Sequence, residues 1–254
     1  PTSRILLNGS AGGVVVEVAE SGASSDPMHL TLRDLGLTGA NTGVAVAGPA
    51  VVRLEGSWAF GNEHGGAASA GALLEIDASS VVRANASVTP GGLYGAGLIC
   101  IGPDTRISVA GTVQDNWVEE GFPSAGGGLY LIDLCLAVLE PGAVIERNSA
   151  AVGGGAYVAS GSRLEGGGAG PLGARISQNA ATAGGGLHVW GSNSVAALQN
   201  VRIESNQARE GAGVYVESGA LVELSRTADR NCAGAPRCLT LSHNILFGDL
   251  GSEG

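Results

Sequence analysis

The sequence predicts an all-β protein with the fold of a right-handed parallel β-helix, a solenoid of roughly eight coils. Three observations predict it: a motif that recurs about every thirty residues, short apolar strands in place of amphipathic helices, and glycine clusters at the turns. Repeats of this length are typical of solenoids and propellers. Of the 254 residues 44 are Gly, yet 44% are hydrophobic, which separates the chain from a disordered glycine-rich linker.

The first element of the repeat is a β-branched residue, two variable residues and Asn. Four copies end at Asn116, Asn148, Asn179 and Asn206, at intervals of 32, 31 and 27 residues. An earlier copy ends at Asn85, and Asn62 and Asn231 are weaker matches. Asn tolerates the left-handed backbone conformation better than most residues. We therefore expect the four asparagines to form a structural ladder at one corner of successive coils.

The second element is a glycine cluster that leads into a short apolar strand. Its copies are Gly126-Gly-Gly-Leu-Tyr-Leu131, Gly153-Gly-Gly-Ala-Tyr-Val158, Gly184-Gly-Gly-Leu-His-Val189 and Gly211-Ala-Gly-Val-Tyr-Val216, with Gly95-Ala-Gly-Leu-Ile-Cys100 in the same frame. Side chains alternate between the two faces of a strand. The aliphatic positions should therefore point into the core, and the residues between them outward: Ile99, Tyr130, Tyr157, His188 and Tyr215.

Other repeat folds fit less well. No run with a period of 3.6 residues is long enough for one helix per repeat, which excludes ankyrin, TPR and leucine-rich repeats. A propeller blade needs about forty residues and four strands, and usually more aromatic residues than the 4% present. We expect one continuous solenoid over residues 1–254, with Pro1 at the start of a mature or excised segment of a longer secreted protein.

These residues resemble a known family. The pairing of xxN with a glycine cluster and an aliphatic residue is similar to the FxxN and GGA[ILV] repeats of the polymorphic outer-membrane proteins, of the autotransporter class. The similarity covers roughly residues 82–216, with Val or Ile in place of Phe, and GGG[AL] or GAGV in place of the strict glycine motif. The resemblance implies a β-helical passenger-type domain at the bacterial cell surface or outer membrane.

Composition excludes several partners. The net charge is −10 and all 13 basic residues are Arg, which argues against nucleic acid and anionic membranes, since both need clustered cations. No apolar run reaches the roughly 18 residues that span a bilayer. The four cysteines form neither a CxxC nor a zinc-binding pattern. Cys232 and Cys238 close a short loop and are predicted to form a disulfide, the alternative being free buried thiols. Cys100 is expected in the core, and whether Cys100 and Cys135 are free or bonded is left open.

The sequence does not carry the catalytic motifs of pectin-degrading β-helices, and we predict no catalytic residue, metal site or cofactor. The strongest acidic cluster is Asp115, Glu119 and Glu120, near Trp117 and Phe122. It is either a calcium or sugar contact or an ordinary solvated loop, and the second is favoured. His64 and His243 have no catalytic partner at a suitable spacing.

We therefore expect an extracellular or cell-surface adhesion or binding module without catalytic activity. Its partner would be a cell-surface protein or a polysaccharide, bound through the outward residues Tyr130, Tyr157, His188 and Tyr215, and through Trp117. If a loop covers the aromatic residues, they serve packing instead. The alternative function is a carbohydrate-active β-helix, related to polysaccharide lyases or glycoside hydrolases, or a glycan-binding domain. An ice-binding or purely structural solenoid is a third hypothesis.

Overall fold

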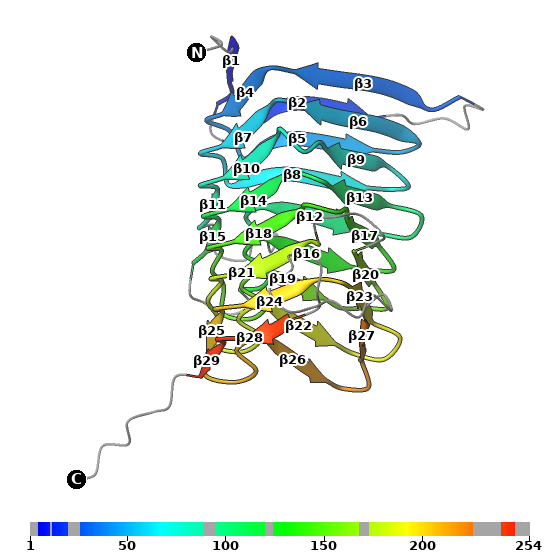
Figure 1. Ribbon diagram of the computed structural model, residues 1–254. Coiled ribbons are helices and arrows are strands. Elements are labelled where there is room, and N and C mark those ends of the chain that lie inside the picture. The colour runs from blue at the N-terminus through cyan, green and yellow to red at the C-terminus, as the bar shows by residue number, and fades with distance from the viewer. Residues whose placement is uncertain are drawn as a thin grey trace.

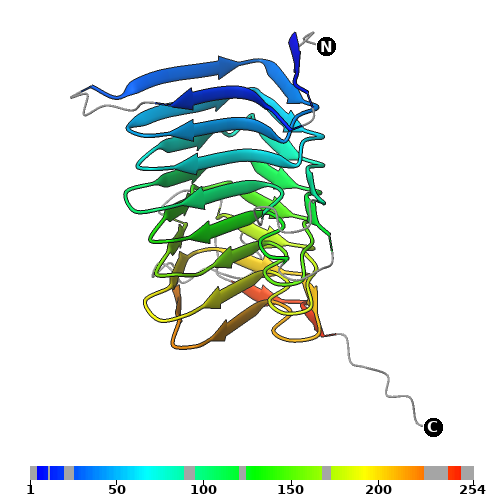
Figure 2. The ribbon, with the colours of Figure 1, turned by 180° about the vertical axis from the view of Figure 1, so that it is seen from behind.

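The computed structural model describes residues 5–10, 12–19, 26–88, 95–119, 124–167, 173–225 and 240–246. In these residues all helical or extended secondary structure consists of β-strands, and all paired strands are parallel. The rungs follow one another along a single axis, from β1 at one end to β29 at the other (Figure 1). The view from behind shows the same order, with the coils following one another along the axis from the N-terminal to the C-terminal end (Figure 2). The predicted parallel β-helix of roughly eight coils is confirmed.

Three long sheets form the walls of the solenoid. Sheet A contains β1 (Ile5–Asn8), β4 (Leu35–Thr38), β7 (Trp58–Phe60), β10 (Val81–Arg83), β14 (Thr112–Gln114), β18 (Val144–Glu146), β21 (Arg175–Ser177), β24 (Arg202–Glu204) and β28 (Thr240–Ser242). Sheet B contains β2 (Val14–Ala19), β5 (Thr42–Ala47), β8 (His64–Ser69), β12 (Leu98–Ile101), β16 (Leu129–Ile132), β19 (Ala156–Val158), β22 (Leu187–Trp190) and β26 (Val214–Glu217). Sheet C contains β3 (Met28–Arg33), β6 (Ala50–Glu55), β9 (Leu73–Ile76), β13 (Arg106–Val109), β17 (Leu136–Leu139), β20 (Arg163–Gly166), β23 (Val195–Gln199) and β27 (Leu221–Ser225).

Each coil therefore visits the three sheets in the same order, A, B and then C. Four two-residue strands lie between sheets A and B, directly after the Asn corner: β11 (Ala86–Ser87), β15 (Trp117–Val118), β25 (Gln207–Ala208) and β29 (Ile245–Leu246). Of these, β11 pairs with β15, and β25 pairs with β29. A residue thus meets the equivalent residues of the coils before and after it, so columns of side chains run along the axis.

The core is built from such columns. In sheet A the β-branched position of the Asn motif is fully buried in every copy: Val82, Val113, Ile145, Ile176 and Ile203. In sheet B the two aliphatic columns pair in the expected register, and Leu98, Leu129 and Leu187 are fully buried. In β26, the last strand of sheet B, the second of these columns is less covered, since Val216 is 41% exposed.

A disulfide joins two successive coils inside this core. Cys100 lies in β12, and Cys135 lies at the corner between β16 and β17 of the next coil. Their Cα atoms are 5.9 Å apart, and both residues are fully buried. Cys100 is therefore a core residue, as predicted, but its bond to Cys135 was not indicated by spacing. The predicted pair Cys232 and Cys238 lies outside the described residues.

Candidate binding face

The corner after sheet A is repeated from coil to coil, and it is built on a ladder of asparagines. Asn116, Asn148, Asn179 and Asn206 occupy equivalent corners after sheet A, and each side-chain Nδ2 donates to Oδ1 of the next asparagine at 2.9–3.0 Å. Each Nδ2 also donates to a carbonyl one coil back, such as that of Val113 from Asn148. The ladder extends in both directions, because Asn62 and Asn85 continue it at one end and Asn244 at the other.

The left-handed residue at this corner is not the asparagine itself. It is the residue before it, with φ of 55° at Asp115, 53° at Arg147, 58° at Gln178 and 59° at Ser205. The expectation that Asn adopts the left-handed conformation is therefore wrong. The preceding residue makes the corner, which leaves the Asn side chain free to turn inward and bond along the axis.

The ladder also explains the glycine clusters. A Cβ built on Gly155 would lie 2.4 Å from the carbonyl oxygen of Gly186 and 2.9 Å from Nδ2 of Asn179, so only glycine fits beside the ladder. Gly128 and Gly186 stand in the same place in neighbouring coils. The first glycine of each cluster, such as Gly153, has a positive φ. The Asn motif and the glycine motif recur together because the last glycine of a cluster packs directly against an asparagine of the ladder.

The outward aromatic residues form one column on sheet B, which we call the aromatic column: Tyr130, Tyr157, His188 and Tyr215. The rings of Tyr130 and Tyr157 stack with centroids 5.6 Å apart and planes 9° apart. His188 makes edge contacts with Tyr157 at 5.3 Å and with Tyr215 at 5.0 Å. Such spacings are favourable for aromatic pairs.

Much of this column is covered by its own coils. Tyr130 is 5% exposed and His188 is 4% exposed, whereas Tyr157 and Tyr215 keep partly exposed rings. The turn before each strand folds over the outer face, so a Cβ on Gly184 would lie 2.6 Å from Cβ of His188. Ala125 packs on Tyr130 in the same way. The exposures therefore favour packing for Tyr130 and His188, and leave ring surface at Tyr157 and Tyr215.

His188 is held in one orientation by Glu217. Its Nε2 lies 3.0 Å from Oε1 of Glu217, while its buried Nδ1 has no hydrogen-bond partner. Burial lowers the pKa of His188, because the charged imidazole is poorly solvated there, and this outweighs the opposite effect of Glu217. We assign the neutral tautomer that donates from Nε2. Burial likewise raises the pKa of Tyr157, with a smaller contribution from the charge of Glu217.

A further exposed aromatic residue, Trp190, lies beside the aromatic column and was not predicted from the sequence. Trp190 lies two residues after His188 on the same outward face, is 43% exposed, and pairs in register with Glu217. Beside it, a hydrogen bond to Glu210 raises the pKa of Tyr215, as do the charges of Glu210 and Glu217. We call Tyr157, Trp190, Tyr215 and Glu217 the aromatic patch. The two-residue alternation from His188 was the signal that could have identified Trp190.

The other predicted contacts lie apart from this patch. Trp117 is 44% exposed on β15, between sheets A and B, where it pairs with Ala86. Asp115 forms an ion pair with Arg147 at 2.7 Å, so it does not join Glu119 in an acidic site. Glu120 and Phe122 lie outside the described residues. His64 is buried, and its Nδ1 lies 2.6 Å from the carbonyl oxygen of Gly95, which gives it a structural role.

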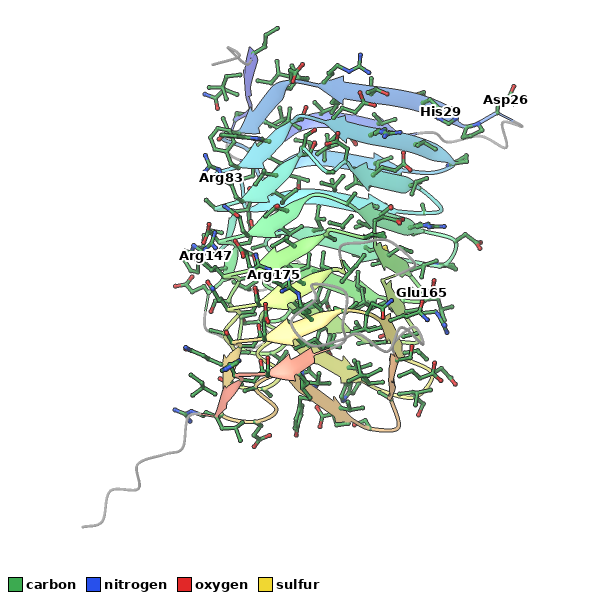
Figure 3. All side chains as sticks on the ribbon, viewed as in Figure 1. Asp26, His29, Arg83, Arg147, Glu165 and Arg175 are labelled. Carbon is green, nitrogen blue, oxygen red and sulfur yellow. A yellow bond between two sulfur atoms is a disulfide. The ribbon has the colours of Figure 1, made fainter. Side chains whose placement is uncertain are left out.

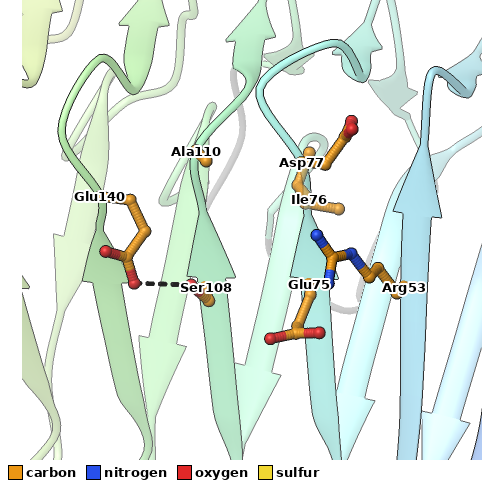
Figure 4. Close-up of a pocket in the computed structure, with 7 residues that line it drawn as sticks. All are labelled: Arg53, Glu75, Ile76, Asp77, Ser108, Ala110 and Glu140. Atoms are coloured by element: carbon orange, nitrogen blue, oxygen red, sulfur yellow. Dashed lines mark hydrogen bonds between the residues drawn. The ribbon is translucent and has the colours of Figure 1, made fainter.

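The outer faces of sheets A and C are charged. On sheet A, Arg175 bonds to Glu146 at 2.7 Å, and the guanidinium of Arg83 lies 4.6 Å from the centre of the Trp58 ring. Figure 3 shows Arg83, Arg147 and Arg175 on this side and Glu165 on the side of sheet C. Sheet C carries two adjoining hollows of about 220 and 200 Å³, which share Arg53 and Glu75 (Figure 4 shows the larger).

No group of three or more His, Cys, Asp or Glu residues in the described part of the chain is arranged to hold a metal ion. Among the same residues, no helix is long and apolar enough to cross a membrane. In comparisons with known proteins, no family model, curated protein or solved structure matches the chain. The aromatic patch itself offers ring faces for stacking, beside a carboxylate that accepts hydrogen bonds.

Proposed function

We propose that the chain is an extracellular β-helical binding module that contacts a surface polysaccharide or protein through the aromatic patch. The observation that carries the proposal is the exposed ring of Trp190, which lies in register with the carboxylate of Glu217 on a rigid sheet. Trp and Tyr give large contact areas at low entropic cost, so they are favoured at binding surfaces.

The patch suits a neutral glycan in particular. Sugar rings present C–H faces to aromatic rings, and their hydroxyls donate to carboxylates such as Glu217, whose side chain is 40% exposed. Acidic glycans would be repelled by Glu210 and Glu217 and by the net charge of −10. The contact between His188 and Glu217 would orient that carboxylate before the ligand arrives.

The proposed location is the bacterial cell surface or the extracellular space. Its support is the buried disulfide between Cys100 and Cys135, because disulfides form and persist in oxidising compartments. The repeat resemblance to polymorphic outer-membrane proteins agrees with an adhesin of the autotransporter type.

Two tryptophans of matched exposure make the test sharp. Trp190 is 43% exposed and belongs to the patch, while Trp117 is 44% exposed and lies on the separate strand β15. We would compare W190A and W117A for binding to an array of neutral and acidic oligosaccharides and to bacterial and host cell surfaces. The expected result is a loss of about tenfold or more in W190A, with W117A close to the parent.

The melting temperature of both variants controls for folding. Loss of binding in W190A at an unchanged melting temperature supports the patch. Equal loss in both variants, or binding that survives W190A and a Tyr215→Ser change together, would move the site elsewhere. A ligand bound only through Trp117 would reject the proposal while leaving a binding function in place.

A further inference from the structure

We propose that the hollow on the outer face of sheet C is a separate site, which binds an extended basic peptide with cationic side chains at every third residue. The larger hollow, of about 220 Å³, is lined by Arg53, Glu75, Asp77, Ser108 and Glu140, among others (Figure 4). It continues into the second hollow across Arg53 and Glu75. This site does not depend on the aromatic patch, which lies on sheet B.

The stacked register aligns the polar groups along the solenoid axis. Thr31, Arg53, Glu75 and Ser108 face outward in one column, on β3, β6, β9 and β13. Glu140 follows β17, one strand further, and its carboxylate accepts a hydrogen bond from Ser108 at 2.9 Å. That bond turns Glu140 toward the column, as Figure 4 shows. A chain lying along the axis would therefore pass both Glu75 and Glu140.

The charges in the hollow differ in how far they are already satisfied. Glu55 pairs with both Arg33 and Arg53, so its single carboxylate is shared between two guanidinium groups. Asp77 accepts hydrogen bonds from Ser79, Ser80 and the N–H of Gly56, which also lower its pKa against the effect of burial. The carboxylates of Glu55 and Asp77 are therefore already engaged by other groups of the protein.

Glu75 and Glu140 are the carboxylates left for a ligand. Glu75 makes no hydrogen bond or ion pair with any residue of the described ranges, and Glu140 has only the neutral hydroxyl of Ser108 as its partner. Two carboxylates without an ion-pair contact among the described residues, in a chain of net charge −10, favour a cation. Arginine or lysine side chains would form charge-assisted hydrogen bonds with them.

The spacing of the strands selects the form of the ligand. Glu75 is on β9 and Glu140 follows β17, two strand spacings away, which is about 9.6 Å along the axis. A polyproline II segment has three residues per turn and rises about 3.1 Å per residue, so its side chains face the same way every 9.3 Å or so. Cations at every third residue would thus meet the two carboxylates in turn.

The experiment uses a fluorescein-labelled peptide of about nine residues, in which Arg alternates with pairs of Pro, and measures its fluorescence anisotropy with the purified chain. The comparison peptide has the same composition with its arginines adjacent. The variants are Glu75→Gln and Glu140→Gln. The matched control is Glu223→Gln, which removes the same charge from the outward column of sheet C, but far from the hollow.

We expect the spaced peptide to bind more tightly than the clustered one, and each hollow variant to weaken it about three- to fivefold. Glu223→Gln should have little effect, and the affinity should fall as salt is added. Absence of binding overturns the proposal. So does equal weakening by all three variants, which would indicate unspecific attraction to an acidic surface. Binding of a glucosamine oligomer through Glu75 and Glu140 in place of the peptide would reassign the site to amino sugars.

Discussion

Asn148 donates twice to the same oxygen, Oδ1 of Asn179, from its backbone N–H at 2.9 Å and from its side-chain Nδ2 at 3.0 Å. The side-chain amide of one coil thus satisfies two donors of its neighbour, one from the main chain. Because Asn148 is 1% exposed, water cannot replace these bonds. At the corner between sheets A and B, the asparagine side chains therefore supply the acceptors that backbone carbonyls supply within the sheets.

Replacing Asn148 by Ala should destabilise the protein by about 2–4 kcal/mol, because several buried groups lose their partner at once. The carbonyl of Val113 loses a donor, and both donors of Asn116 lose their acceptor. Urea unfolding followed by circular dichroism measures the change. Gln199→Ala removes an exposed amide from β23 and should stay within about 0.5 kcal/mol of the parent. Similar losses in both variants would contradict a special role for the ladder.

Gly155→Ala tests the contact between the glycine cluster and the ladder. The new Cβ would lie 2.4 Å from the carbonyl oxygen of Gly186, which is backbone and cannot move aside without opening the stack. We expect a loss of about 3 kcal/mol or more, or failure to fold. Gly142→Ala is the control, since its φ is 92° but a Cβ there meets nothing within 4 Å. That variant should cost only about 1–2 kcal/mol of backbone strain, as thermal unfolding would show.

Stability should decrease as the pH falls below about 6.5, because burial lowers the pKa of both His64 and His188 in the folded chain. The unfolded chain takes up protons below the ordinary histidine pKa of about 6.5, while the folded chain resists them, so unfolding is favoured as the pH falls. Protonated His188 would also carry a donor at Nδ1 with no acceptor. Melting temperatures across this range, in the parent and in a His64→Gln, His188→Gln double variant, measure the effect.

The double variant should show a flatter profile over this pH range, although its stability at neutral pH is lower. His29→Gln is the control, because His29 is exposed on β3. An unchanged pH profile in the double variant would assign the acid sensitivity to carboxylates instead.

The fold was predictable because the recurring residues are the ones that face each other across coils. Asn148 and Asn179 hydrogen-bond to each other, and Ile145 and Ile176 are paired neighbours in sheet A, so the spacing in the sequence directly reflects the coil. The aromatic column followed from the same alternation. Its burial did not, because the cover comes from the turns before each strand, and the sequence does not show how those turns fold.

Other features could not be inferred because their residue types vary from coil to coil. The left-handed corner is occupied in turn by Asp115, Arg147, Gln178 and Ser205, which differ in charge and in size. The disulfide partner of Cys100 lies 35 residues away, in the next coil and at a corner rather than in the equivalent strand, so no short spacing reveals it. The hollow on sheet C combines side chains from several strands, and only their register brings Glu75 beside Ser108.

The disulfide between Cys100 and Cys135 has a mechanical consequence. A solenoid pulled from its ends can lose coils one at a time, since each coil contacts only its neighbours. Unravelling from either side would stop at the cross-link, because the 35-residue separation between the two cysteines cannot be extended while the bond is intact. About 120 Å of contour length would stay hidden until a reductant reaches a bond that is fully buried. In a single-molecule pulling experiment, adding reductant should lengthen the fully extended chain by about this amount.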